Sequence, residues 1–85
     1  MNIEYRTDKN ILYIALEGRI DASNAALAEE KIFGIKYENV GKHTVIDADK
    51  LEYISSAGLR VILKLRKEEP KLAIINVAPD RKSVV

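Results

Sequence analysis

The stretch TVIDADKLEYISSAGLRVIL, residues 44–63, shows the sharpest change of pattern along the chain. Its first three residues form a short apolar run, which predicts a buried strand that ends at Asp47. A polar loop follows, and Ser56 then begins a helix whose interior is rich in leucine, isoleucine and valine. That helix turns basic near its end, where cations suit the helix dipole, and Pro70 closes it. A strand, a loop and a helix in this order predict an α/β domain.

Two further strands are predicted upstream. Residues 2–6 alternate polar and apolar side chains, which is typical of a strand with one face in water. Residues 11–17 form a second strand, and the short turn-like link between the two runs predicts an antiparallel hairpin. Gly18 is expected to end this second strand or to bend it.

A helix is predicted from the 21–24 segment, which offers several candidate N-caps, to about Asn39. Four of its residues fall at helical spacing and form one apolar stripe: Ala25, Ala28, Ile32 and Ile35. Gly34 weakens such a helix by about 1 kcal/mol relative to alanine, so we interpret it as a point of close packing. Gly41 is the expected stop.

The last predicted strand is the continuous apolar run 72–77, because such runs usually lie inside parallel sheets covered by helices. Pro79 suits the first position of a third helix. The predicted order is β-β-α-β-α-β plus the start of a third helix. Right-handed crossovers then place both helices on one face of a mixed four-stranded sheet. A third helix of about seven residues needs tertiary packing. We therefore expect either one domain of a longer protein or a homodimer formed through the short C-terminus.

Composition excludes several classes of function. The 85 residues correspond to one domain, and 14 basic against 13 acidic side chains give no broad attraction to nucleic acid or to a membrane surface. Without cysteine the chain has no disulfide and no thiolate metal site, which fits a reducing compartment. No apolar run has membrane-spanning length, and residues 1–5 lack the features of a signal peptide. We expect a cytoplasmic protein.

Catalytic signals are nearly absent. His43 is the only histidine, and its place at a strand start indicates a solvated side chain. Asp47, Asp49 and Glu52 are close enough in sequence to suggest a metal site, but a strand end followed by a polar loop explains them better. The four glycines have no phosphate-binding spacing. The basic group is diluted by two glutamates, which is typical of a solvated helix end; its members are Lys64, Arg66, Lys67 and Lys71. We expect no enzyme, no cofactor and no metal.

The segment Ser55–Gly58 is the one stretch with a specific chemical possibility. A serine at a helix start is usually an N-cap that contributes about 1 kcal/mol, and on its own that interpretation is the more common one. The same position also suits an anion, because free backbone N–H groups and the helix dipole stabilise it. A phosphate on Ser56 would add about −1.5 to −2 charges without breaking the helix. Gly58 is expected to let a partner's backbone approach closely.

Residues 44–63 closely resemble the signature of STAS domains, which include bacterial anti-sigma factor antagonists and the cytoplasmic domains of sulfate transporters. The stretch LEGRIDASNA, residues 16–25, resembles the second strand and first helix start of that family, and residues 71–79 match the strand and proline that follow. The resemblance covers nearly the whole chain. It implies that residues 1–85 are a STAS domain that lacks the C-terminal end of the full family domain.

For an antagonist of this type the resemblance implies a phosphorylation switch at Ser56. The partner would be an anti-sigma factor that is also a serine kinase; the unphosphorylated antagonist binds it, phosphorylation ends the binding, and a phosphatase resets the cycle. The implied partner-binding residues are Asp21, Ser23, Ser55, Ser56, Ala57, Gly58 and Leu59. Many relatives have aspartate where this chain has Ser55, which could alter kinase recognition or make Ser55 a competing acceptor.

Two other functions stay open. The chain could be a STAS assembly or regulatory domain of a larger transporter or signalling enzyme, without a phosphoswitch. A small enzyme or nucleotide-binding domain is disfavoured, because the sequence has neither a glycine-rich phosphate loop nor a histidine-centred site. Phosphate found on Ser56 would separate the first interpretation from the second.

Overall fold

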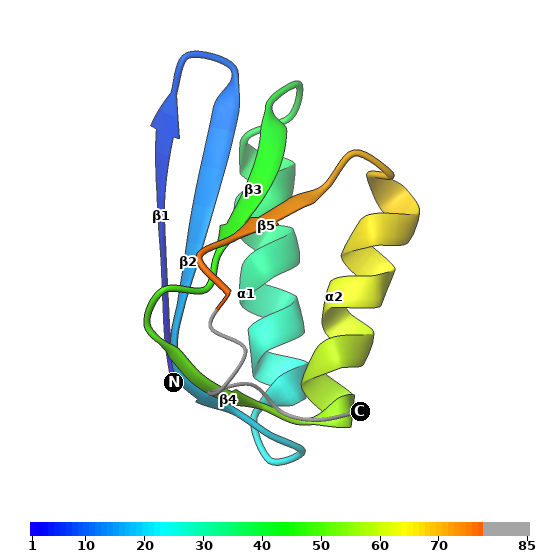
Figure 1. The fold of residues 1–85 in the computed structure, drawn as a ribbon. Helices are drawn as coiled ribbons and strands as arrows, with labels where there is room; N and C mark the ends of the chain where they lie inside the picture. The colour runs from blue at the N-terminus through cyan, green and yellow to red at the C-terminus, as the bar shows by residue number, and fades with distance from the viewer. Residues whose placement is uncertain (78–85) are drawn as a thin grey trace.

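The computed structural model describes residues 1–77 and contains five strands and two helices (Figure 1). In chain order they are β1 (Asn2–Asp8), β2 (Ile11–Ile20), α1 (Ala25–Glu38), β3 (His43–Asp47), β4 (Leu51–Ile54), α2 (Ser56–Glu68) and β5 (Ala73–Ile75). The expected third helix at Pro79 lies outside the described residues. Neither described helix combines the length and apolar character that crossing a bilayer requires.

The strands form one mixed sheet in the order β1-β2-β3-β5, with β4 paired to the far end of β2. The predicted hairpin is confirmed, since β1 runs antiparallel to β2. The other pairings are all parallel. The predicted fold class is confirmed, but the count of four strands is wrong. Leu51–Ile54 was expected to be part of a polar loop, yet Leu51 and Ile54 are buried and the segment pairs with β2.

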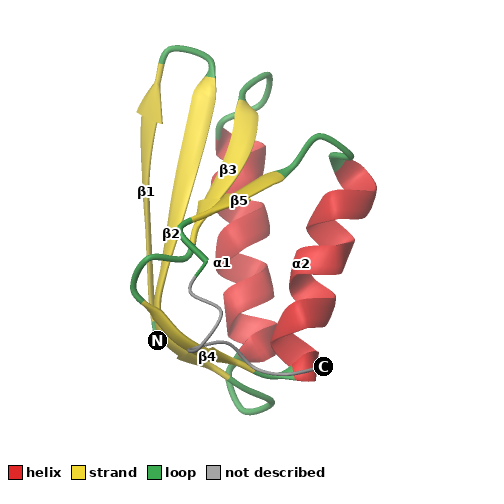
Figure 2. Ribbon diagram, in the orientation of Figure 1, coloured by secondary structure: helices red, strands yellow, loops and turns green. Residues whose placement is uncertain are grey.

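Both helices cover the same face of the sheet, as Figure 2 shows. Alternate residues of β2 point into this layer, and Leu12, Ile14 and Leu16 are almost completely buried there. From α1 the core receives Ala25, Ala28 and Ile32, three of the four residues of the predicted apolar stripe. The two layers therefore enclose one hydrophobic core, as the binary pattern predicts.

Two expectations about packing are wrong. Gly34 does not mark a close contact, because it is exposed and a Cβ placed there would meet no atom within 4 Å. The apolar run at residues 72–77 is not a buried strand, because only Ala73–Ile75 pair, at the edge of the sheet beside β3. On this edge Ile74 and Ile75 remain 46% and 37% exposed. Apolarity alone predicted the strand but could not show that it has a neighbour on one side only.

Candidate functional site

The parallel pairing of β2 with β4 brings two distant parts of the sequence together. Ile20 lies opposite Ile54, and the backbone N–H of Ser55 donates to the Ile20 carbonyl over 2.8 Å. Both strands end at this point, so the 21–24 loop and the first turn of α2 leave the sheet side by side. The site implied by the resemblance is thus assembled from one loop and one helix start, at the end of the β2–β4 pair.

The β2–β4 pairing contains a β-bulge in which Glu52 of β4 is the extra residue, because Gly18 lies opposite Leu51 and Arg19 lies opposite Tyr53. The register shifts between Gly18 and Arg19, and Gly18 has a φ of +81°, a conformation that glycine adopts far more readily than other residues. The Gly18 N–H donates to the Lys50 carbonyl over 3.0 Å. Gly18 therefore bends the strand rather than ending it, and β2 changes partner from β3 to β4 at this residue.

Ser55 and Ser56 have different structural roles. Ser55 is the N-cap of α2: its backbone is extended, and its Oγ accepts a hydrogen bond from the Gly58 N–H at 3.3 Å. Ser56 is the first helical residue and is exposed, and its hydroxyl makes no hydrogen bond to any residue in the 1–77 range. The prediction that a serine begins this helix is confirmed, but the capping role belongs to Ser55.

Gly58 faces the protein interior, so the expectation that it opens space for a partner's backbone is wrong. It is buried, and a Cβ on it would lie 2.6 Å from Ile54 Cγ1 and 2.9 Å from Ile20 Cγ2. Real Cβ contacts are essentially never that short, so a side chain here requires the two isoleucines to move. The glycine lets α2 pack tightly on the paired ends of β2 and β4.

Asp21 organises the neighbouring loop. Its Oδ1 accepts hydrogen bonds from both the backbone N–H (2.9 Å) and the hydroxyl of Ser23. Asn24, the residue before α1, accepts from the Asp21 N–H and donates to the Arg19 carbonyl, so its side chain is used within the loop. The hydrogen bonds from Ser23, helped by the charge of Arg19, hold the pKa of Asp21 below its ordinary value of 3.8. The loop therefore presents a carboxylate at neutral pH.

The remaining implied residues lie partly in the core. Ala57 and Leu59 are half-buried and pack against the core cluster, so each offers only part of its surface to a partner. Arg19 and Tyr53 face each other across the β2–β4 pair, with the guanidinium 4.5 Å from the ring centroid. This pair could not be predicted from the sequence, because Tyr53 was expected in a loop and only the strand register brings the two residues together.

Asp47, one of the three acidic residues considered as a metal site, has other partners. Oδ1 of Asp47 accepts from the Asp49 N–H at 3.0 Å and from Asn76 Nδ2 at 2.9 Å. Glu52 is exposed on β4. Within residues 1–77 no three histidine or carboxylate side chains come together in a metal-binding group. Asp47 thus ties the end of β3 to the segment that follows β5.

His43 lies at the other end of the sheet from Ser56. It begins β3 opposite Ile11, the first residue of β2, and its Nδ1 is 3.4 Å from Glu69 Oε2. The same carboxylate oxygen accepts the Thr44 N–H at 2.8 Å, and its other oxygen is 3.6 Å from Lys36 Nζ. Partial burial acts to raise the pKa of Glu69, but the Thr44 hydrogen bond and the nearby Lys36 and His43 outweigh it and lower the pKa. This cluster joins both helix ends to β3.

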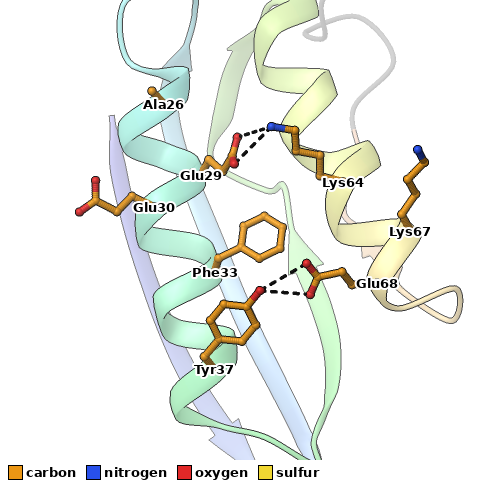
Figure 3. A pocket seen from close by; sticks show the side chains of 8 residues that line it. All are labelled: Ala26, Glu29, Glu30, Phe33, Tyr37, Lys64, Lys67 and Glu68. Carbon is orange, nitrogen blue, oxygen red and sulfur yellow. Dashed lines mark hydrogen bonds and ion pairs between the residues drawn. The ribbon is translucent and has the colours of Figure 1, made fainter.

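A groove runs between the two helices (Figure 3). Its volume is about 590 Å³, and Phe33 lies between two polar bridges. Lys64 Nζ contacts Glu29 at 3.1 Å on one side, and the Tyr37 hydroxyl donates to Glu68 at 3.3 Å on the other. Most polar groups of this groove therefore bind one another and fasten α1 to α2.

Comparison with known proteins gives one consistent family. The family model described as "STAS domain" matches residues 2–82. BtrV of Bordetella bronchiseptica, a protein named as an anti-sigma factor antagonist, is 31% identical over 78 residues; the match covers 87% of this chain and 66% of the length of BtrV.

Two solved structures share the fold. The anti-sigma factor antagonist SpoIIAA in its unphosphorylated form superposes with a TM-score of 0.72 at 15% identity, over 93% of this chain and 76% of that one. An anti-sigma factor antagonist from Mycobacterium paratuberculosis superposes with a TM-score of 0.73 at 18% identity, over 86% of this chain and 62% of that one. The match of the family model confirms the family predicted from residues 44–63, and the chain belongs to the STAS domain family.

Proposed function

We propose that this chain is an anti-sigma factor antagonist that acts in the cytoplasm by binding and is switched off by phosphorylation of Ser56. A kinase-type anti-sigma factor would be both its partner and the enzyme that modifies it. In that step the Ser56 hydroxyl oxygen attacks the γ-phosphate of ATP, the bond to the β-phosphate oxygen breaks, and ADP and a proton leave. A phosphatase would hydrolyse the phosphoserine and restore binding.

The observation that carries this proposal is the separation of roles between the two serines. Because Ser55 caps α2, the hydroxyl of Ser56 is not needed to hold the helix and stands exposed at its start. A kinase can therefore modify Ser56 without removing a structural hydrogen bond. Ser55 is half-buried and its oxygen already accepts the Gly58 N–H, so it is the poorer acceptor.

The environment of Ser56 also suits a phosphate. The N–H groups of Ser56 and Ala57 have no partner within residues 1–77, as is usual for the first turn of a helix. These groups and the helix dipole stabilise an added anion. Folding would survive phosphorylation, whereas a protein surface docked on this turn would meet a new charge of about −2.

The names of two related proteins support the proposal. BtrV carries the name of an anti-sigma factor antagonist, and the SpoIIAA structure is described as an unphosphorylated form, which implies a phosphorylated one for that protein. The aspartate that many relatives have before the acceptor serine is replaced here by Ser55. Both residue types are good N-caps. The substitution therefore keeps the cap and removes only a charge beside Ser56.

The proposed partner surface combines the first turn of α2 with the adjacent loop. Asp21 and Ser23 contribute from the loop; Ser55, Ser56, Ala57 and Leu59 contribute from α2. Gly58 supports this surface from below through its contact with the two isoleucines. The Arg19–Tyr53 pair flanks it on the sheet. Arginine and tyrosine are, with tryptophan, the side chains that contribute most often to binding energy in interfaces.

A binding experiment with three variants tests the proposal. Ser56→Asp imitates the charge, Ser56→Ala removes the acceptor, and Thr7→Asp on exposed β1 adds the same charge away from the site. The parent, Ser56→Ala and Thr7→Asp should each capture a kinase-type anti-sigma factor from lysate of the source cells. Ser56→Asp should capture at least about tenfold less of this factor. Equal capture by Ser56→Asp, with circular dichroism showing an intact fold, would favour a STAS assembly module without a phosphoswitch.

A further inference from the structure

The packing of α2 determines which of its residues face solvent. Gly58, Val61 and Leu65 are buried against the core. At 3.6 residues per turn, the opposite side of the helix carries Ser56, Arg60, Leu63 and Lys67. The exposures agree with this geometry, since Leu63 is 59% exposed and the other three are also exposed. We call these four residues the outer ridge of α2.

Arg60 is the first charged residue on this ridge after Ser56. The two are four residues apart, so their Cα atoms are separated by one helical turn, or about 6 Å along the axis. Side chains on a helix lean toward its N-terminus, so a long side chain at position 60 reaches back toward position 56. Within residues 1–77 Arg60 has no ion pair, whereas Lys64, one turn further on, is bound to Glu29.

We propose that Arg60 is the internal counter-ion of a phosphate on Ser56. This inference rests on the proposed function, because it concerns the modified state of the same serine. The planar guanidinium presents paired N–H donors that match two phosphate oxygens, which makes a stronger and more directional contact than an ammonium group does. An i to i+4 pair of opposite charges is also the spacing at which helical side chains attract each other.

The pairing changes what phosphorylation does to the partner surface. Before modification, Arg60 has no ion pair within residues 1–77, lies one turn from Ser56 and can meet a carboxylate of the partner. After modification, the phosphate adds negative charge and also engages the guanidinium. One modification thus adds an anion to the surface and withdraws a cation from it.

The other charges around Ser56 define the control. Asp21, on the adjacent loop, acts to raise the pKa of a phosphate on Ser56, but it is the same in every variant. Arg66 lies on the same helix, is exposed and has no ion pair within residues 1–77. It is ten residues from Ser56, about 15 Å along the axis, which is beyond the Debye length at physiological salt. Arg66→Gln therefore removes the same charge without touching the proposed pair.

The test uses protein in which phosphoserine is incorporated at position 56 during synthesis, so that neither kinase nor partner is needed. Phosphorus NMR follows the second ionisation of the phosphate, ordinarily near pH 6, in the parent and in three variants. Arg60→Gln should raise this pKa by roughly 0.4 of a pH unit, the shift that corresponds to an exposed i to i+4 pair. In Arg60→Lys the phosphate pKa should stay close to the parent value, and in Arg66→Gln it should equal the parent value.

Equal pKa values in the parent and Arg60→Gln, or equal shifts in Arg60→Gln and Arg66→Gln, would overturn the proposed pair. Neither result would bear on the proposed function, since the phosphate is supplied chemically. Conversely, failure to find phosphate on Ser56 in cells would refute the proposed function and leave the titration result intact. The two claims are therefore tested separately.

Discussion

Removing each serine hydroxyl in turn tests the assignment of structural and switching roles most simply. Ser55→Ala deletes the acceptor that satisfies the Gly58 N–H, whereas Ser56→Ala deletes a hydroxyl with no partner within residues 1–77. Both changes remove one oxygen atom from adjacent positions. Any difference between the two variants therefore reports on what each hydroxyl does in the folded protein.

The expected magnitudes follow from helix capping. Replacing an N-cap serine by alanine costs about 1 kcal/mol, within a range of about 0.5–2. The long 3.3 Å contact of Ser55 favours the lower half of that range. For a domain of this size about 1 kcal/mol corresponds to roughly 4–8 °C in Tm. Ser56→Ala should change stability by less than about 0.5 kcal/mol, because the residue is exposed and alanine suits a helix.

Thermal and urea unfolding followed by circular dichroism measures both values. We expect that Ser55→Ala lowers the Tm clearly, that Ser56→Ala leaves it nearly unchanged, and that the urea m-value stays the same in both. The reverse order, with Ser56→Ala the less stable variant, would refute the reasoning. It would mean that Ser56 holds the helix and is not a free acceptor.

Three further tests, which use four substitutions, have definite expected outcomes. Gly58→Ala should destabilise the fold by about 1–3 kcal/mol, because the new Cβ would lie 2.6 Å from Ile54 Cγ1. Gly34→Ala should stabilise the fold by up to about 1 kcal/mol, because a Cβ there meets no atom within 4 Å. Equal Tm shifts in the two variants would contradict the packing described. The lowered pKa of Glu69 means that its charged form stabilises the fold fully above pH 4.5 and that this contribution is lost as the pH falls through the lower folded-state pKa. The stability advantage over Glu69→Gln should therefore disappear on acidification, and an advantage that grows toward low pH would show the sign to be wrong. The exposed apolar edge at Ile74 should promote self-association at high concentration, weakened by Ile74→Lys; a strictly monomeric sedimentation profile of the parent would argue against it.

The sequence predicted the elements with strong periodicity or strong end signals. The apolar spacing of α1 and the short apolar run before Asp47 identified one helix and one strand, and each is present. β4 was missed because a four-residue strand gives too short a pattern, and because its partner, the Gly18–Ile20 end of β2, is far away in the sequence. The edge position of β5 was missed because an apolar run does not show how many neighbours a strand has.

The structure brings together the two segments named for the candidate site, but the roles of individual residues within them differ from the expectation. The motif around Ser56 pointed to the first turn of α2, and the loop at Asp21 lies beside it as the resemblance implied. Which serine caps the helix depends on where the helix begins, and sequence patterns leave that uncertain by a residue or two. The inward direction of Gly58 depends on the Ile20–Ile54 pairing, which is a tertiary contact.

The most direct measurement of the central claim is a pull-down from native lysate with ATP, followed by mass spectrometry of the bait and of the captured proteins. We expect a kinase-type anti-sigma factor among the captured proteins and phosphate on Ser56 of the bait, with none on Ser55. Phosphate on Ser55 instead would contradict the assignment of roles within the first turn. A bait without phosphate, bound to a transporter, to another enzyme or only to itself, would contradict the switch.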